Sequence, residues 1–262
     1  MNKLLLLICI TSFSAFSKDV SLESIFSKSP VEGTIVVENL DGSEKYVFNP
    51  DRAKTKLAVA STFKIPNTLI GVEENIVSSE SSVFPWDGKQ YDIQAWNHDQ
   101  TLASAFQVSC VWCYQEIAKK VGAEKYKTYV KAIHYGHLPN TFDLTQFWLD
   151  GTLKLNAYEQ VAFLKQLYHQ KLPFSTKSFN VLKEVMLAEK TENYSMYAKS
   201  GWARRVKNPV GWYVGYLETK NGTWFFATNL AIKDVKQLNL RKEISMEVLE
   251  KIGVISSAFE KI

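Results

Sequence analysis

Two residues suited to nucleophilic catalysis, Ser61 and Lys64, stand three positions apart in the chain. They follow an apolar run at 57–60 and open a predicted helix. Side chains three apart share a helix face, so the amine can reach the hydroxyl. A serine needs a base to take its proton, and a lysine can be that base only when its charge is suppressed. Alone the pattern is weak, because about one Ser-x-x-Lys occurs by chance in a chain of this size.

Two further groups carry similar side chains. Lys199, Ser200 and Gly201 lie on a predicted strand before a β-hairpin, where the glycine would let a ligand approach the backbone and the lysine would supply a cation. Ser109 lies with Val111 in a predicted central helix. Taken alone, the first group is equally explained by an ordinary strand end, and Ser109 by a tolerated helical serine.

The strands that could hold these groups are expected near the two ends of the chain. Runs rich in β-branched and aromatic residues occur at 35–40 and 45–48, and again at 211–219 and 223–232. Each pair is joined by a short turn that contains glycine, which is typical of a β-hairpin. One more strand is predicted at 197–203. We therefore expect an α+β fold with one antiparallel sheet built from both termini.

Helices are expected between these strands and after them. Apolar residues recur at helical spacing over 102–117, which predicts one continuous helix. Asn156, with Glu159 three residues later, resembles a capping box at the start of another helix. The segment 241–252 is predicted to be an amphipathic helix that ends at Gly253. The central helices would form a second lobe beside the sheet.

Composition excludes several classes of protein. The 262 residues are 46% hydrophobic and 22% charged, which is too apolar for an intrinsically disordered chain. The 31 basic and 27 acidic residues give a net charge of +4 and are interspersed, so we expect no nucleic-acid partner. We expect a single catalytic domain over 18–262. Its sheet would come from 18–60 and 195–262, and its helical lobe from about 61–194.

The first residues are typical of a secretory signal peptide. Lys3 precedes an apolar run at 4–10, and Ala15 and Ser17 form a small-x-small cleavage pattern. The apolar run is too short to span a bilayer. We expect cleavage after Ser17, export to the periplasm and no membrane association. The alternative is a buried first helix.

Two cysteines remain after the signal peptide, Cys110 and Cys113, in a spacing that also occurs in redox and metal sites. No βαβ pattern surrounds them, so we expect two buried thiols or a local oxidised pair rather than redox catalysis. The four histidines show no pair at helical spacing partnered by a carboxylate, and we expect no metal.

In combination and in this order, the three groups resemble the penicillin-recognising serine enzymes, and most closely the class D serine β-lactamases, the oxacillinase family. The segments at 84–89, 147–151 and 240–242 are also similar to that family's pattern. Tyr135 stands where the family has Tyr-Gly-Asn, with His137 in place of the Asn, and the effect of that change stays open. The resemblance covers nearly the whole mature chain. It implies the β-lactamase/transpeptidase-like fold.

The resemblance also implies a role for each group. Ser61 would be the nucleophile, and Lys64 would be the general base as a carbamate formed from CO2, an N6-carboxylysine. Ser109 would relay a proton, supported by Lys199. The residues expected to bind substrate are Ser200, Gly201, Trp202 and Arg241, and those expected beside the carbamate and the deacylating water are Val111, Trp148 and Leu149. Apart from CO2 or bicarbonate no cofactor is implied. The partner would be a small-molecule β-lactam, and the chain a monomer or homodimer.

Two other readings share the three groups. A D,D-peptidase of cell-wall synthesis would deacylate penicillin very slowly, and it usually lacks the Trp-Leu-acidic-Gly segment found at 148–151. A penicillin-sensing domain of a receptor would form a stable adduct, but we would expect membrane helices and an output domain with it. The preferred β-lactams, carbapenems included, are not indicated by the sequence.

Overall fold

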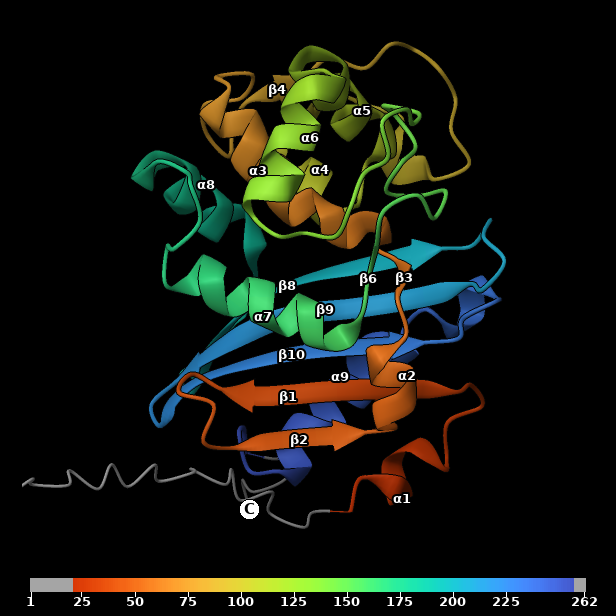
Figure 1. Ribbon diagram of the computed structural model, residues 1–262, viewed down its shortest axis with the longest axis vertical. Coiled ribbons are helices and arrows are strands. Elements are labelled where there is room, and N and C mark those ends of the chain that lie inside the picture. Colours follow the sequence, from red (N-terminus) through yellow and green to blue (C-terminus); the bar gives the residue numbers. More distant parts are fainter. Residues whose placement is uncertain (1–20, 257–262) are drawn as a thin grey trace, which may run out of the picture.

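The computed structural model describes residues 21–256, and its largest element is an antiparallel sheet of six strands in the order β2-β1-β10-β9-β8-β7 (Figure 1). The signal peptide expected at 1–17 lies outside the described residues. The six strands are β1 (Gly33–Asn39), β2 (Lys45–Phe48), β7 (Leu187–Lys190), β8 (Tyr194–Ala203), β9 (Val210–Thr219) and β10 (Gly222–Leu230). Two short ladders pair β3 (Leu57–Ala58) with β6 (Lys154–Leu155) and β4 (Val83–Phe84) with β5 (Gln100–Thr101).

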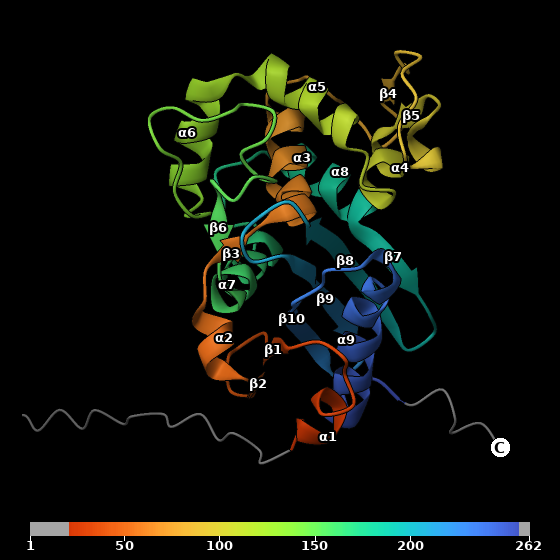
Figure 2. The ribbon, with the colours of Figure 1, turned by 90° about the vertical axis from the view of Figure 1, so that its right-hand side faces the viewer.

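The helices of the described residues lie mostly in a lobe above the sheet and on its two faces (Figures 1 and 2). They are α1 (Glu23–Phe26), α2 (Pro50–Lys54), α3 (Lys64–Glu73), α4 (Leu102–Gln107), α5 (Val111–Val121), α6 (Ala123–Ala132), α7 (Ala157–Tyr168), α8 (Thr176–Met186) and α9 (Leu240–Lys251). Three short 3-10 helices are η1 (Ala60–Phe63), η2 (Gln94–Trp96) and η3 (Val235–Gln237).

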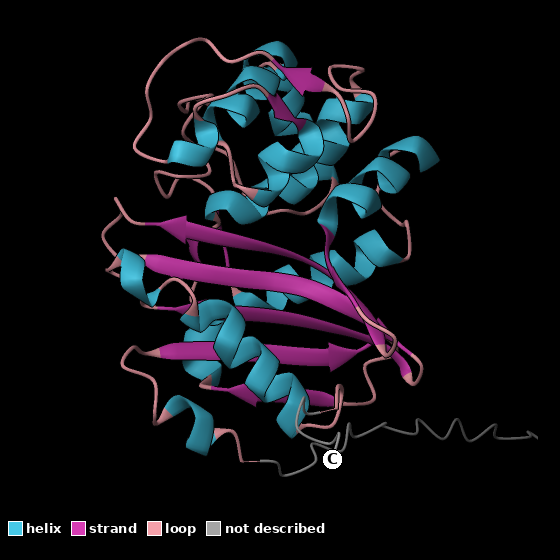
Figure 3. Ribbon diagram, turned by 180° about the vertical axis from the view of Figure 1, so that it is seen from behind, coloured by secondary structure: helices cyan, strands magenta, loops and turns pink. Residues whose placement is uncertain are grey.

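Both faces of the sheet are covered, and the strands alternate accordingly. On β1, Val36 belongs to the core shared with the helical lobe, whereas Ile35 and Val37 belong to a second core. This is the alternation that a pleated strand imposes. On the first face lies α7, and behind the sheet lies α9 with buried Val248 and Leu249 (Figure 3).

The predicted sheet is confirmed. Both hairpins, the strand expected at 197–203 and the final helix occur within a few residues of the expected bounds. Asn156 and Glu159 form the reciprocal capping box at the start of α7. Gly253 has a φ of +78° and ends α9, which is the left-handed conformation that favours glycine.

The prediction of one continuous helix over 102–117 is wrong. The chain forms α4 and then α5, with Ser109 in the break at a φ of +55°. The Cys110 N–H donates to the carbonyl of Ala105, which ends α4 (2.9 Å). Both helices bury their apolar side in the same core, so the apolar spacing continues through the break and hides it.

Two elements differ from the expected division into sheet and lobe. Strand β7 comes from the stretch 61–194 yet joins the sheet beside β8. Helix α7 also comes from that stretch, but it packs on the sheet, where Lys165 donates to Glu38 of β1 (2.5 Å). Inside the lobe, α3 is buried on every side from Lys64 to Val72. A helix enclosed in this way carries its first residues into the interior.

Candidate active site

Ser61 lies in η1, between β3 and α3. The preceding residue, Ala60, has a φ of +50°, a conformation that costs a non-glycine residue free energy and persists where its surroundings hold it. The Thr62 hydroxyl donates to the carbonyl of Val59 (2.6 Å) and supports the turn. Ser61 itself is 7% exposed. The chain therefore presents a serine at a constrained turn that is almost closed to bulk water.

Lys64 begins α3 directly beyond this turn. The residue is 1% exposed, and its Nζ lies 4.4 Å from the centroid of the Tyr114 ring. Among the described residues Nζ has no hydrogen-bond partner. Burial holds the pKa of the Lys64 amine well below its usual value, and the nearby positive charge of Lys199 lowers it further. The site therefore favours the neutral amine, which is the form that can act as a base or nucleophile.

Trp148 supplies a second buried polar group without a partner. Its ring stacks on Phe63, the residue before Lys64, with centroids 5.9 Å apart. The Nε1 of Trp148 is buried and has no acceptor within the described chain. A buried indole N–H ordinarily finds an acceptor. Two polar groups of this region, the Lys64 amine and the Trp148 N–H, are thus buried without partners among the described residues.

Lys199 of β8 connects this region to Ser109 across the cleft between sheet and lobe. Its Nζ donates to the Ser109 Oγ at 2.6 Å, although the two residues are 90 positions apart in the chain. Lys199 is 3% exposed. Burial lowers its pKa to about 7, and the charge of Arg241 contributes to the shift. A group with that pKa can both take and give a proton near neutral pH.

Gly201 brings β8 against Ser61. A Cβ at this position would lie 3.1 Å from the Ser61 backbone nitrogen and 3.2 Å from that of Thr62. Such contacts are tighter than ordinary packing, so the absence of a side chain permits the close approach. Ser200 and Trp202 alternate to the opposite face, and the Trp202 Nε1 donates to the carbonyl of Ile232 (3.1 Å).

Among the described residues, one edge of β8 is free beside Ser61. Strand β7 pairs with β8 only as far as Tyr197, and residues 199–203 have no strand on that side within the described chain. A free edge presents backbone N–H and C=O groups to any ligand that lies along it. Backbone groups of residues 199–203 can therefore contribute to ligand binding in addition to the side chains of the site.

Arg241 approaches the same strand from α9. Its Nη1 donates to the carbonyl of Gly201 (2.8 Å) and its Nε to that of Leu238 (2.6 Å). Burial lowers the pKa of Arg241 to about 10, so the guanidinium stays charged at neutral pH. A charged group held by two backbone carbonyls beside β8 is suited to binding an anion.

The remaining predicted residues lie around this centre. Val111 begins α5 and Leu149 follows Trp148; both are half-buried, and Leu149 packs against the core. His137 is exposed, and no hydrogen bond of its side chain occurs within residues 21–256. Its neighbour Tyr135 is fully buried. The substitution in this loop therefore lies at the surface, whereas the tyrosine of the same segment points inward.

Sequence reasoning missed two tyrosines that support the site. Tyr114 lies under Lys64, and its hydroxyl shares a hydrogen bond with Thr68 (2.8 Å). The Tyr135 hydroxyl lies 3.3 Å from the Thr62 Oγ1, one residue after Ser61. The position of Tyr114 three residues after Val111 places it on the same helix face, which was the available indication.

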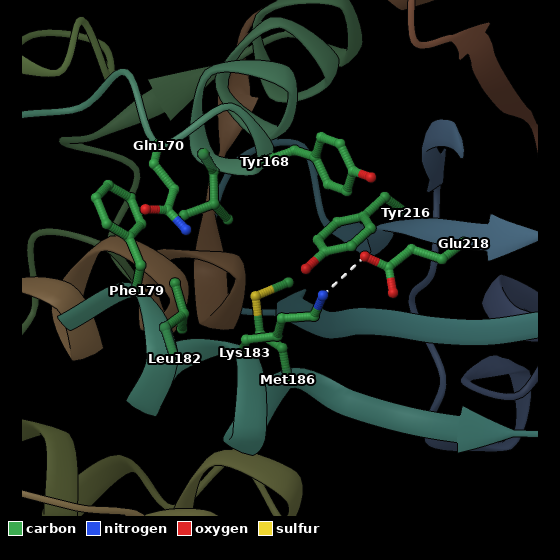
Figure 4. A pocket seen from close by; sticks show the side chains of 9 residues that line it. Tyr168, Gln170, Phe179, Leu182, Lys183, Met186, Tyr216 and Glu218 are labelled. Carbon is green, nitrogen blue, oxygen red and sulfur yellow. Dashed lines mark hydrogen bonds and ion pairs between the residues drawn. The ribbon is translucent and has the colours of Figure 1, made fainter. Parts of the chain in front are cut away.

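Two cavities are distinct in character. One of about 260 Å³ lies next to the site and includes Lys199 and Ser200 in its lining. The other, of about 280 Å³, lies between α7, α8 and β9, away from the reacting groups (Figure 4). In that second cavity Lys183 is paired with Glu218 at 2.8 Å. Among residues 21–256 no group of His, Cys, Asp or Glu is arranged to hold a metal ion, and none of their helices is long and apolar enough to cross a membrane.

Comparison with known proteins agrees with this geometry. Residues 34–252 match the family described as the penicillin binding protein transpeptidase domain. The chain is 36% identical to the β-lactamase OXA-48 of Klebsiella pneumoniae over 240 residues, 92% of this chain and 91% of that protein. It is 34% identical to the β-lactamase OXA-10 of Pseudomonas aeruginosa over 253 residues, 94% of this chain and 95% of the relative.

Solved structures give the same result. The class D β-lactamase YbXI from Nostoc superposes with a TM-score of 0.87 at 34% identity and covers 90% of this chain and 100% of its own. The class D β-lactamase FUS-1 (OXA-85) from Fusobacterium nucleatum subsp. polymorphum gives 0.85 at 36% identity, with 89% and 98% covered. With serine, lysines and arginine gathered at the edge of a transpeptidase-like sheet, the chain belongs to the class D serine β-lactamases.

Proposed function

We propose that this enzyme opens the ring of penicillin-type β-lactams through an acyl-enzyme on Ser61, with Lys64 carrying a carbamate as the general base. One observation carries the proposal. Beside a serine at a constrained turn stands a fully buried lysine that has no hydrogen-bond partner among the described residues and whose charge is suppressed. A permanently charged lysine in that place would be an unpaired buried cation, which is costly.

The surroundings of Lys64 fit a carbamate. A neutral amine can attack the carbon of CO2, form a C–N bond and lose one proton, which leaves an anion on the side chain. The Nε1 of Trp148 would donate a hydrogen bond to that anion. It has no acceptor among the described residues, and its ring stacks on Phe63, the residue before Lys64. When formed, the carbamate supplies an anionic base beside the Ser61 hydroxyl.

Acylation then uses the groups around Ser61. Its Oγ loses a proton and attacks the lactam carbonyl carbon, and the C–N bond of the ring breaks. The leaving nitrogen takes a proton from Ser109, which Lys199 replaces across their 2.6 Å hydrogen bond. The backbone N–H groups of Ser61 and Trp202 would stabilise the negative charge on the carbonyl oxygen.

Substrate binding uses the other side of β8. Arg241, aided by Ser200, would bind the carboxylate of the β-lactam, because a charged guanidinium favours a carboxylate through charge-assisted hydrogen bonds. The free edge at 199–203 would align the substrate along the strand. Deacylation requires a water that attacks the ester carbonyl of the acyl-enzyme, and the half-buried Val111 and Leu149 would border its entry.

Export to the periplasm and a role in antibiotic resistance complete the proposal. The oxidised pair of Cys110 and Cys113 supports an oxidising compartment. A susceptible bacterium that expresses the full chain should survive higher penicillin concentrations than one that expresses Ser61→Ala. Equal survival of the two strains would contradict the proposed role in resistance.

Turnover is the decisive test of the chemistry. Purified protein is mixed with excess penicillin, and the loss of ring absorbance is followed with and without bicarbonate at fixed pH. Many turnovers per enzyme, faster with bicarbonate, are expected for a hydrolase with a carbamylated lysine. A single stoichiometric burst that bicarbonate does not extend would instead indicate a penicillin-binding or penicillin-sensing protein that acylates without turnover.

A further inference from the structure

The oxidised pair Cys110–Cys113 is a chemical feature that the mechanism above does not use. The two residues are three positions apart, with Cα atoms 5.6 Å apart, and the bond joins the residue after Ser109 to the first turn of α5. Both cysteines are completely buried. A buried pair cannot meet the thiol of a partner protein, so thiol exchange is not its role in the folded enzyme.

The pair adjoins a second constrained turn of the site. Ser109 has a φ of +55°, a conformation that a serine keeps only where neighbouring groups hold it. On the α4 side, the Cys110 N–H is bonded to the carbonyl of Ala105 (2.9 Å). The Trp96 Nε1 also donates to the carbonyl of Val108 (3.0 Å). These hydrogen bonds hold the end of α4 in place, but they do not hold the first turn of α5.

The disulfide fixes that second side. Cys110 is the N-cap of α5, and its Sγ also accepts from the Cys113 N–H (3.2 Å). A covalent link between these two residues holds the cap against the helix even when the hydrogen bond opens. The position of Ser109 relative to α5 is thereby restricted from both sides.

A small displacement of Ser109 would matter because its hydroxyl makes a short contact with Lys199. The Ser109 Oγ lies 2.6 Å from the Lys199 Nζ, on a strand that belongs to the sheet rather than to the lobe. Nothing in the covalent chain near Ser109 couples it to β8. The distance therefore depends on how rigidly the lobe holds the turn, since proton transfer is sensitive to such separations.

We propose that the Cys110–Cys113 disulfide is a positioning device that holds Ser109 in proton-transfer contact with Lys199 during acylation. This inference rests on the role proposed above for Ser109. The two cysteines act through Ser109 and touch no reacting atom.

A double-mutant cycle tests the proposal. Cys113→Ala breaks the link and keeps the Cys110 cap, whereas Cys110→Ser breaks the link and keeps a capping oxygen. Each change is made in the wild-type chain and in Ser109→Ala, and the acylation rate is measured from the pre-steady-state burst with penicillin. In the wild-type chain we expect acylation to slow by about tenfold or more, since misplacement of a catalytic group is costly. In Ser109→Ala the same change should alter acylation less than about twofold, because the group being positioned is gone.

The control is Val248→Ala, a buried position in α9 on the other face of the sheet. It lowers stability through a cavity and should leave acylation unchanged. If neither cysteine variant folds, the wild-type and Ser109→Ala chains are unfolded in urea, reduced with dithiothreitol, which is oxidised to its cyclic disulfide while two thiols form, and refolded with the reductant present. Alkylation and mass spectrometry confirm the reduction, and the same cycle is run on that material.

The outcomes separate this inference from the proposed function. Equal losses in both backgrounds, or no loss in either, would overturn the positioning role of the disulfide. If Ser109→Ala alone acylates at the wild-type rate, the role of Ser109 is wrong and the inference falls with it. If wild-type protein shows no turnover of penicillin at all, the proposed function fails, and the cycle on the burst still decides whether the disulfide acts through Ser109.

Discussion

Lys64 and Lys183 each lie beside a tyrosine ring, but their pKa values are shifted in opposite directions. The Lys64 Nζ lies 4.4 Å from the ring centroid of Tyr114, and the Nζ of Lys183, which lines the cavity of Figure 4, lies 5.0 Å from that of Tyr197. The pKa of Lys64 is held well below its usual value by burial. At Lys183 burial acts in the same direction, but the hydrogen bond and charge of Glu218 outweigh it and raise the pKa.

The difference lies in the partner rather than in the aromatic ring. Lys183 has a carboxylate at 2.8 Å and is half-exposed, so its ammonium form is stabilised. Among residues 21–256 Lys64 Nζ has no hydrogen-bond partner, and besides burial the positive charge of Lys199 lowers its pKa. In this fold a buried lysine favours its neutral, reactive form where no carboxylate pairs with it.

Removal of the two lysines should give the largest contrast. Lys64→Ala should lower kcat by about a thousandfold or more, because loss of the proposed base would disable the whole catalytic unit. Lys183→Ala should change kcat by less than about twofold, since it contacts no reacting group. Steady-state hydrolysis of penicillin measures both. A comparable loss in the two variants would mean that Lys64 acts through stability alone.

Removal of the Trp148 indole N–H should have the next largest effect, because this donor is proposed to bind the carbamate on Lys64. Trp148→Phe keeps an aromatic ring and removes only the donor, so deacylation should slow by about tenfold to a hundredfold, the value of one hydrogen bond to a charged group. Trp148→Ala should slow deacylation further, and added bicarbonate should partly restore both variants. The acyl-enzyme is counted by mass spectrometry during turnover. Trp224→Phe, at a half-buried tryptophan of β10, is the matched control and should accumulate no acyl-enzyme.

The pH dependence follows from the lowered pKa values. Below its pKa the neutral fraction of an amine falls about tenfold per pH unit, so turnover should decline on the acid side and be partly rescued by bicarbonate.

The free energy of unfolding should also depend on pH. Lys199 has a pKa of about 7 when folded, so between pH 7 and the higher pKa of an unfolded lysine the unfolded chain binds more protons. The free energy of unfolding should therefore rise with pH over that range, and a flat urea-denaturation series from neutral to mildly alkaline pH would contradict the buried, uncompensated state of Lys199.

The smallest effect is expected at the ion pair of Lys183. Glu218→Gln removes the carboxylate, so burial should then lower the Lys183 pKa, which NMR titration of lysine ammonium groups can follow. The pair is partly exposed, and its loss should cost only about 0.5 kcal/mol in the free energy of unfolding. Turnover should not change. A drop in turnover would show that the cavity of Figure 4 is coupled to the active site.

The sheet and its hairpins could be predicted from the sequence because their information is local. Runs rich in β-branched and aromatic residues at 35–40 and 211–219, with turn residues between strands, favour strands whatever lies around them. The helix break at Ser109 could not be predicted in this way. Its apolar spacing is continuous, and the break is stabilised by contacts to Trp96 and Ala105 together with the disulfide.

The sequence alone determined the candidate groups, since Ser61, Lys64, Ser109, Lys199 and Arg241 were identifiable from motif order and from the resemblance they carry. Only the tertiary structure decided their electrostatic state. The Lys199 Nζ reaches Ser109 across 90 residues, and Tyr114 covers Lys64 where no acceptor is available within the described chain. The reason is physical: a pKa depends on burial and on nearby charges, and both are set by segments far apart in sequence.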